Sequence, residues 1–184
     1  KRRKLDISAS LMASIAKSSS QRPTGPKKNT KKTEYIKMKD HTPSEQAEVV
    51  QKWHSLLQKE DRPYTLEDFR FQILVAARIH ARCQESTVRH AMRTLHQTMP
   101  ITVSHMATCD TEEFANAIKN LQFYSTKAKQ IQTAAQQIQT LHQSQVPETE
   151  EELLKIMGIG PVLADLLAFV NTREIHTNGF HATD

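Results

Sequence analysis

Near its C-terminal end the sequence reads Leu154-Lys155-Ile156-Met157-Gly158-Ile159-Gly160-Pro161-Val162-Leu163-Ala164. Two glycines bracket one apolar residue, and apolar residues at helical spacing lie on both sides. Glycine lets the backbone turn without a Cβ clash, and proline at the first helical position presets φ for the second helix. The segment therefore predicts a helix-hairpin-helix, with a plain tight turn between two helices as the alternative.

A hairpin of this form has a definite binding chemistry. The first N–H groups of its second helix have no partner within that helix, and the helix dipole favours an anion beside them. Pro161 removes one of these donors because proline has no N–H. The residues predicted to hold a nucleic-acid phosphate are Gly158, Ile159, Gly160 and Val162. Such a contact is independent of base sequence and serves DNA or RNA.

The rest of the chain from Thr42 onward is also helical in pattern. Helix-opening caps are predicted at Thr42-Pro43-Ser44-Glu45, Thr65-Leu66-Glu67-Asp68, Asp110-Thr111-Glu112-Glu113 and Thr149-Glu150-Glu151-Glu152, with Ser125 or Thr126 capping another helix. No alternating strand pattern of any length occurs, and four glycines among 184 residues allow few tight turns. We predict an all-α, multi-helix globule of six to eight helices over residues 43–184.

The positive charge is concentrated at the N-terminal end. Residues 1–42 hold twelve basic and three acidic side chains, whereas residues 43–184 carry a net charge of −4 within an overall charge of +5. A segment of this composition cannot bury enough apolar surface to fold alone. We expect an extended basic tail that binds nucleic acid through Lys27, Lys28, Lys31 and Lys32. A solvated or targeting tail is the alternative.

Further basic residues recur within the helical part. Arg78, Arg82, Arg89 and Arg93 follow one another at spacings of 4, 7 and 4 residues. This spacing predicts a basic stripe that could meet phosphate, with a solvated face paired to Glu85 as the alternative. Phe123 and Tyr124 are expected to lie in the core.

Other classes of protein are disfavoured. No apolar run approaches the ~18 residues that a membrane-spanning helix needs. The two cysteines, Cys83 and Cys109, cannot build a disulfide framework or a thiol-only metal site, and we expect them to be small core residues. The nine histidines are scattered. We predict no metal site and no cofactor.

Three further segments precede the hairpin in a fixed order. These are Phe71-Gln72-Ile73-Leu74-Val75-Ala76, then Leu121-Gln122-Phe123-Tyr124-Ser125-Thr126-Lys127-Ala128, then Val146-Pro147. Over about residues 64–184 this order resembles the endonuclease III-like superfamily of helix-hairpin-helix (HhH-GPD) DNA glycosylases. The resemblance implies a helical domain whose hairpin grips a nucleic-acid backbone.

The chain departs from this family's pattern at the chemically important positions. Lyase-active members place a Schiff-base lysine where this chain has Val162, which has no amine. The family's essential carboxylate falls on Asn178, whose neutral amide cannot replace it. Arg82 stands where members usually carry a duplex-probing glutamine, and Gln122 replaces a glycine. Members continue with further helices, whereas this sequence ends six residues after Asn178.

These departures favour a family fold that has lost its chemistry. We expect no catalytic residue, and predict a non-catalytic scaffold that binds nucleic acid, RNA rather than DNA, beside protein neighbours in a large ribonucleoprotein. A mitochondrial ribosome is the concrete expectation, because a basic tail on a reused enzyme fold suits that setting and residues 1–22 resemble the flank of a transit peptide. A nuclear location is the alternative. The competing function is a base-excision DNA glycosylase in a truncated or inactivated form, Asn178 being natural or introduced.

Overall fold

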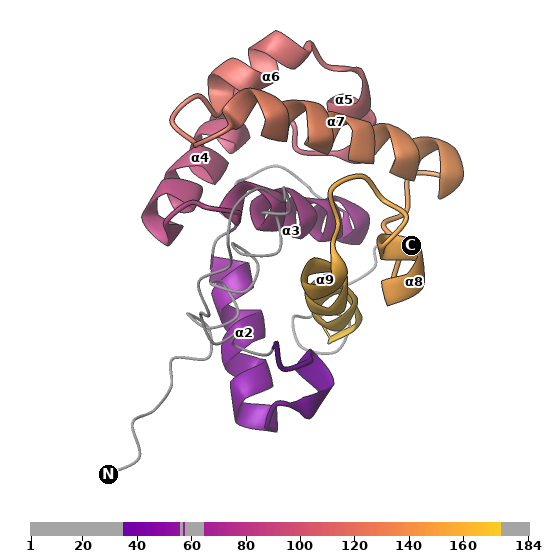
Figure 1. Cartoon of the computed structure of the whole chain (residues 1–184). Helices are drawn as coiled ribbons and strands as arrows, with labels where there is room; N and C mark the ends of the chain where they lie inside the picture. Colours follow the sequence, from indigo (N-terminus) through magenta and orange to yellow (C-terminus); the bar gives the residue numbers. More distant parts are fainter. Residues whose placement is uncertain (1–34, 56, 58–64, 174–184) are drawn as a thin grey trace, which may run out of the picture.

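The computed structural model describes residues 35–55, 57 and 65–173 (Figure 1). Over this part the chain forms the 3-10 helix η1 (Met38–Asp40) and then α2 (Pro43–Ser55), α3 (Leu66–His80), α4 (Glu85–Thr98), α5 (Val103–Thr108), α6 (Thr111–Ala117), α7 (Tyr124–Leu141), α8 (Glu150–Leu153) and α9 (Pro161–Arg173). No strand occurs among these residues. The predicted all-α fold is confirmed.

Four of the predicted helix starts are capped as expected. Glu45 and Thr42 exchange hydrogen bonds at the start of α2, and Asp68 and Thr65 do the same at α3. The Asp110 carboxylate accepts from the amides of Glu112 and Glu113, and the Thr149 hydroxyl accepts from the amide of Glu152. These starts could be predicted because each cap joins residues two or three positions apart.

Helix α7 begins differently from the prediction. Its N-cap is Phe123, which has a φ of +58° and makes no side-chain cap, and the helix starts at Tyr124. Capping by Ser125 or Thr126 is therefore wrong. The left-handed residue turns the chain into the helix where a side-chain cap would ordinarily do so.

Helix α3 lies at the centre of the molecule. Every residue from Arg70 to His80 is buried, and α3 packs against α4, α7 and α9. Figure 1 shows α7 with α5 and α6 on one side of α3 and α2 on the other. A helix with neighbours on several sides needs apolar residues around its circumference, and Ile73–Ala77 supply them.

The folded part begins before residue 42. Met38 is fully buried, and the Gln46 amide of α2 donates to the carbonyls of Met38 (2.9 Å) and His41 (3.1 Å). The end of the predicted basic tail, from Tyr35 to His41, thus packs on the helical domain. We call this segment the strap. The boundary predicted at residue 42 lies several residues too late.

Candidate nucleic-acid interface

Helices α8 and α9 and the turn between them form the predicted hairpin. Successive amide bonds tighten the turn: Ile156 donates to Leu153 O (3.1 Å), and Ile159 donates to Ile156 O (3.1 Å). Ile159 is only 6% exposed, so the apolar residue between the two glycines anchors the turn in the core. Gly160 O then accepts from the amides of Leu163 and Ala164, which opens α9.

Gly158 is required for two separate reasons. Its φ is +79°, a left-handed value that side-chain-bearing residues rarely adopt. A Cβ at this position would also lie 2.8 Å from both the guanidinium carbon and Nε of Arg78. The hairpin therefore rests directly on the guanidinium of an arginine from the central helix, and a larger residue at position 158 would displace that guanidinium.

Gly160 differs from Gly158. It does not have a positive φ, and a Cβ built on it would meet nothing within 4 Å. The space above Gly160 is open, at the start of a helix of 13 residues. The first N–H groups of a helix lack helical acceptors and carry its positive dipole end. Pro161 has no N–H and Leu163 donates to Gly160 O, so the Val162 amide is the first-turn donor left at this end of α9. An anion of phosphate size can approach it through the open space at Gly160.

Arg78 does not lie on an exposed stripe. It is 8% exposed, its side chain donates to the Gln130 amide oxygen of α7, and burial lowers the pKa of its guanidinium. Helix α3 also ends at His80 and α4 begins at Glu85, so the four arginines do not share one helix. The prediction of a continuous basic stripe is wrong, because the central position of α3 buries the side chain.

Arg82 lies in the loop after α3 and faces Phe123. Its guanidinium carbon is 5.5 Å from the centre of the Phe123 ring, an arrangement typical of a cation–π contact. Both residues have positive φ, +61° for Arg82 and +58° for Phe123. Phe123 is 58% exposed and Tyr124 is 39% exposed, so the expectation that they lie in the core is wrong. Two loops hold this arginine–aromatic pair at the surface in unfavourable backbone conformations.

A buried lysine supports the Arg82 loop. Lys127 Nζ donates to the carbonyls of Ile79 (2.9 Å) and Ala81 (2.8 Å) and lies 3.0 Å from Cys83 Sγ. Burial lowers the pKa of this amine. The lysine satisfies carbonyls at the end of α3 and fixes the loop that presents Arg82. The sequence contains one signal for this role: Lys127 lies four positions before the buried Ile131 and therefore on the same face of the helix.

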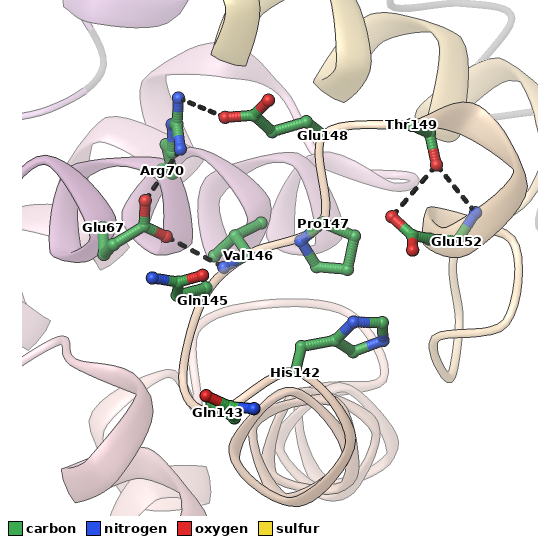
Figure 2. A pocket seen from close by; sticks show the side chains of 10 residues that line it. All are labelled: Glu67, Arg70, His142, Gln143, Gln145, Val146, Pro147, Glu148, Thr149 and Glu152. Atoms are coloured by element: carbon green, nitrogen blue, oxygen red, sulfur yellow. Dashed lines mark hydrogen bonds and ion pairs between the residues drawn. The ribbon is translucent and has the colours of Figure 1, made fainter.

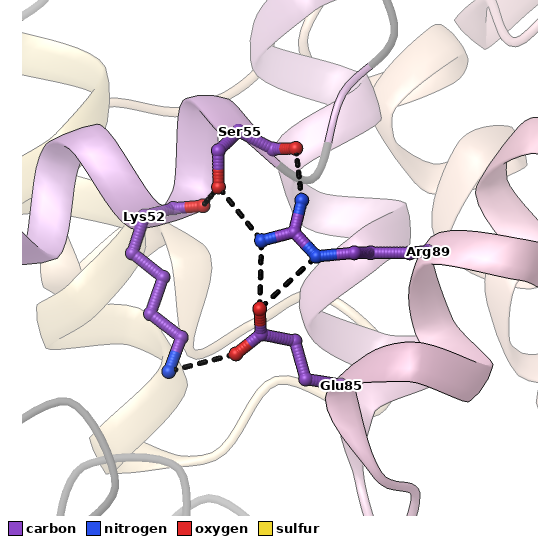
Figure 3. Close-up of polar contacts among 4 residues, drawn as sticks. All are labelled: Lys52, Ser55, Glu85 and Arg89. Atoms are coloured by element: carbon purple, nitrogen blue, oxygen red, sulfur yellow. Dashed lines mark hydrogen bonds and ion pairs between the residues drawn. The ribbon is translucent and has the colours of Figure 1, made fainter.

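Arg89 is engaged within the protein. It contacts the Glu85 carboxylate at 2.6 Å, and donates to the backbone carbonyl and hydroxyl of Ser55 at the end of α2 (Figure 3). Lys52 of α2 pairs with the other oxygen of Glu85 at 2.9 Å. We call these four residues the α2–α4 cluster. Arg89 thus ties two helices together, contrary to the expectation that it faces phosphate.

A polar pocket of ≈ 530 Å³ lies at the start of α3 and beside the loop between α7 and α8 (Figure 2). Arg70, which is 5% exposed, pairs there with Glu67 (2.7 Å) and Glu148 (2.8 Å). Glu67 also accepts from the amide of Val146 at 2.9 Å. These contacts hold the loop that leads into the hairpin.

The remaining predicted residues are placed as follows. Val162 lies in the first turn of α9, partly buried against the core. Lys27, Lys28, Lys31, Lys32 and Asn178 lie outside the described residues. Within the described ranges, no group of three or more histidine, cysteine, aspartate or glutamate side chains could hold a metal ion. In that same part, no helix has the length and apolar character to cross a membrane.

An all-α domain closed by a helix-hairpin-helix defines the class of this protein. The family model described as "HhH-GPD superfamily base excision DNA repair protein" matches residues 75–179. The match includes the C-terminal part of the central helix, all of α7 and the hairpin, and covers more than half of the chain. The chain belongs to the HhH-GPD superfamily, as the resemblance in the sequence implied.

Curated relatives are endonuclease III proteins. The chain is 30% identical to endonuclease III of Bacillus subtilis over 54% of this chain and 45% of the relative. It is 27% identical to the chloroplastic endonuclease III homolog 2 of Arabidopsis thaliana, over 58% of this chain and 28% of the relative. The chain thus spans less than half the length of these relatives.

Solved structures show the same fold. An endonuclease III trapped as a covalent intermediate with DNA superposes with a TM-score of 0.53 and 19% identity, covering 72% of this chain and 61% of the other. A non-covalent endonuclease III–DNA complex gives a TM-score of 0.50, also at 19% identity, covering 70% of this chain and 59% of the other. The predicted endonuclease III-like fold is confirmed.

Proposed function

We propose that this protein binds the sugar–phosphate backbone of nucleic acid through the hairpin. The proposal is carried by the different environments of the two hairpin glycines. Gly158 is locked in a left-handed turn on Arg78, and Gly160 leaves open space at the start of α9. A rigid turn beside the Val162 amide, at the positive dipole end of α9, is a phosphate-binding geometry.

The Arg82–Phe123 pair extends this surface. A phenylalanine that is 58% exposed presents a ring on which a base can stack, and the arginine beside it supplies a positive charge for phosphate. Backbone strain at two facing loop residues is typical of functional sites. We assign Arg82 and Phe123 to the contact with an unpaired or displaced base, with the hairpin holding the backbone nearby.

More specifically, we propose that the protein is a non-catalytic scaffold. Val162 supports it, because an aliphatic side chain at the start of α9 cannot form the Schiff base made by lyase-active relatives. The basic residues among positions 1–42 support a partner with many phosphates, as in a ribonucleoprotein, with RNA preferred over DNA. A mitochondrial ribosome remains the proposed setting, and the nucleus the alternative.

The second candidate is a base-excision DNA glycosylase. Membership of a superfamily described by base excision DNA repair favours it, as does the similarity to endonuclease III in complexes with DNA. If the protein is a glycosylase, the presence of Val162 in place of the lysine removes only the lyase chemistry. Monofunctional members of the superfamily also lack this lysine. The ligand is then DNA. Some of the residues that release the base would lie outside the part of the chain that the structure describes.

One experiment separates the candidates. Base release is measured on a panel of lesion-containing DNA duplexes for the wild type and for Asn178→Asp, and binding of structured RNA and of DNA duplex is followed across a salt series. Excision by the wild type would establish the glycosylase and overturn the scaffold. Excision only by Asn178→Asp would identify an inactivated glycosylase. Salt-sensitive binding without excision by either form, tighter for RNA, supports the scaffold.

The hairpin itself is tested by Gly160→Ala. The added methyl group occupies the open space at the start of α9, so binding weakens while the fold is kept. Arg93→Ala, on the exposed surface of α4, is the matched control for a change away from the hairpin. Equal affinity of Gly160→Ala and wild type for both nucleic acids would overturn the proposal that the hairpin binds the backbone.

A further inference from the structure

A thiol and an amine lie in contact behind the Arg82 loop. Lys127 Nζ of α7 is 3.0 Å from Sγ of Cys83, which lies between α3 and α4. The two residues are 44 positions apart in sequence, so the packing of α7 against α3 brings them together. Reacting atoms held about 3 Å apart are already in a near-attack arrangement.

The lysine is held in place by three acceptors. Its Nζ donates to the carbonyls of Ile79 (2.9 Å) and Ala81 (2.8 Å), and the Cys83 sulfur accepts the third proton of the ammonium group. Lys127 is 4% exposed, and burial lowers the pKa of its amine. A larger share of this amine is therefore in the neutral form that can act as a nucleophile.

Cys83 is a free cysteine and, unlike the lysine, is only partly buried. Peroxide oxidises a cysteine in steps, and the first product is a sulfenic acid. The sulfur of a sulfenic acid condenses with a neighbouring thiol or nitrogen. At Cys83 the neighbouring group is the amine of Lys127.

Cys109, the second cysteine, has a different setting. Its Sγ donates to the Met106 carbonyl at 3.6 Å. Burial, followed by the nearby charge of Glu113, raises the pKa of the Cys109 thiol. Less of it is then the reactive thiolate, and the group it contacts is a carbonyl, which cannot condense with an oxidised sulfur. Cys109 is thus an internal control for Cys83.

We propose that Cys83 and Lys127 form a modification site, at which a peroxide converts the pair into a covalent sulfur–nitrogen cross-link. In the first step the Cys83 thiol takes one oxygen from hydrogen peroxide, becomes a sulfenic acid, and releases water. In the second step the neutral Lys127 amine attacks the sulfur, the S–O bond breaks, and the hydroxide leaves as water with a proton from the amine. The sulfur loses two electrons and the peroxide gains them, so no other oxidant is needed.

The cross-link also changes the support of the Arg82 loop. The linked nitrogen is uncharged and keeps one N–H, so it can no longer donate to both Ile79 O and Ala81 O. Arg82 lies between Ala81 and Cys83 and faces Phe123 at the proposed binding surface. We expect the oxidised protein to bind nucleic acid more weakly. This consequence rests on the proposed binding function, whereas formation of the cross-link does not.

The cross-link is tested by mass spectrometry. The full chain is treated with increasing hydrogen peroxide and digested without reductant. The expected product joins the peptides that contain Cys83 and Lys127, with a mass two hydrogens below that of the two reduced peptides together, and dithiothreitol restores both. Cys83→Ser is expected to abolish the product, and the matched control Cys109→Ser to keep it. Recovery of Cys83 only as a sulfenic or sulfinic acid, or in a disulfide, with Lys127 unmodified, would overturn the proposal.

A further variant tests the role of the amine. Lys127→Arg keeps a cation that can donate to the carbonyls at the end of α3, but its guanidinium is a poor nucleophile. Dimedone, which labels sulfenic acids, is expected to label Cys83 about tenfold more strongly in this variant than in the wild type, because the sulfenic acid is no longer captured. Equal labelling would overturn the second step. Where thermal melting shows that Lys127→Arg does not fold, the mass of the wild-type product and its loss in Cys83→Ser decide the question.

The effect on binding is measured on the same samples by fluorescence anisotropy, with a labelled DNA duplex and a structured RNA. Peroxide is expected to weaken binding by the wild type and by Cys109→Ser about fivefold, reversibly with dithiothreitol, and to leave Cys83→Ser unchanged. A cross-link without loss of affinity would overturn the coupling to the Arg82 loop. If Gly160→Ala binds as tightly as the wild type, binding by the hairpin fails, and the mass measurement still decides whether the modification site exists.

Discussion

The α2–α4 cluster and the Arg82–Phe123 pair hold arginines of the same sequence stretch in opposite electrostatic settings. In the cluster, Arg89 and Lys52 share the carboxylate of Glu85. At the other end, Arg82 faces an aromatic ring, and Arg78 beneath the hairpin contacts the neutral amide of Gln130. No carboxylate pairs with Arg78 or Arg82 among the interactions of the described residues. The paired Arg89 holds the fold and the buried Arg78 supports the hairpin from below, whereas the exposed Arg82 remains available to phosphate.

The largest expected effect separates the two glycines of the hairpin. Gly158→Ala is expected to destabilise the protein by about 3 kcal/mol, because it combines a strained positive φ with overlap on the Arg78 guanidinium. Gly160→Ala is expected to cost at most about 1 kcal/mol, since its Cβ enters open space. Urea unfolding of both variants measures the difference. Equal losses would mean that the turn relaxes its positive φ at Gly158 and that the Arg78 guanidinium moves aside for the side chain.

The next largest expected effect distinguishes Arg82 from Arg89. Arg82→Ala is expected to weaken duplex binding about tenfold and to reduce the salt slope by about 1, with stability unchanged. Arg89→Ala is expected to lower the stability by about 1 kcal/mol, because α2 loses its tie to α4, and to leave the affinity unchanged. Anisotropy and thermal melting on the same samples give both values. A loss of affinity in Arg89→Ala equal to that in Arg82→Ala would break the distinction.

Phe123 offers a smaller and more unusual effect. Phe123→Asn is expected to stabilise the protein by about 0.5 kcal/mol, because asparagine tolerates the left-handed conformation that phenylalanine adopts here. The same change removes the exposed ring and is expected to weaken binding of single-stranded or mismatched nucleic acid more than that of a perfect duplex. A lower melting temperature for Phe123→Asn would show that the ring is held for packing instead.

The smallest expected effect concerns pH. His80 ends α3 beside Trp53, and burial, followed by the positive charge of Lys52, lowers the pKa of its imidazole. The unfolded chain then binds this proton more readily than the folded chain, so the stability from this residue is lost as the pH falls below the ordinary pKa of 6.5. Urea unfolding between pH 7.5 and 5 is expected to show a steeper loss for the wild type than for His80→Leu. Parallel curves would mean that the pKa of His80 is the same in the folded and the unfolded chain.

The helical part was largely predictable because its signals are local. Thr42, Thr65, Asp110 and Thr149 each cap a helix through a residue two or three positions away, and such pairs can be read directly. The hairpin was also predictable, since its glycines, proline and flanking apolar residues lie within one segment. The start of α7 was not, because Phe123 takes a left-handed conformation that its residue type disfavours.

The functional surface was predictable only in part. Arg82 was singled out by the family resemblance, and its partner Phe123 was assigned to the core by its apolar character alone. Lys127 was visible as a lysine on the apolar face of a helix, but its acceptors belong to α3, 46 and 48 residues away in sequence. The charge of residues 1–42 was evident in the composition, while the contacts of Tyr35 and Met38 with Asp165 of α9 were not.

The sequence by itself determined the class of fold, the four helix starts with side-chain caps, the hairpin and the family, since each depends on spacings of a few residues along one segment. Only the tertiary structure decided which cations face solvent. Arg78 is buried because α7 and the hairpin turn close over α3, and Arg89 is engaged because α2 ends beside it. Tyr35 meets Asp165 across 130 residues for the same reason. Burial and pairing depend on which distant segments pack together, and this information is not contained in any single stretch of sequence.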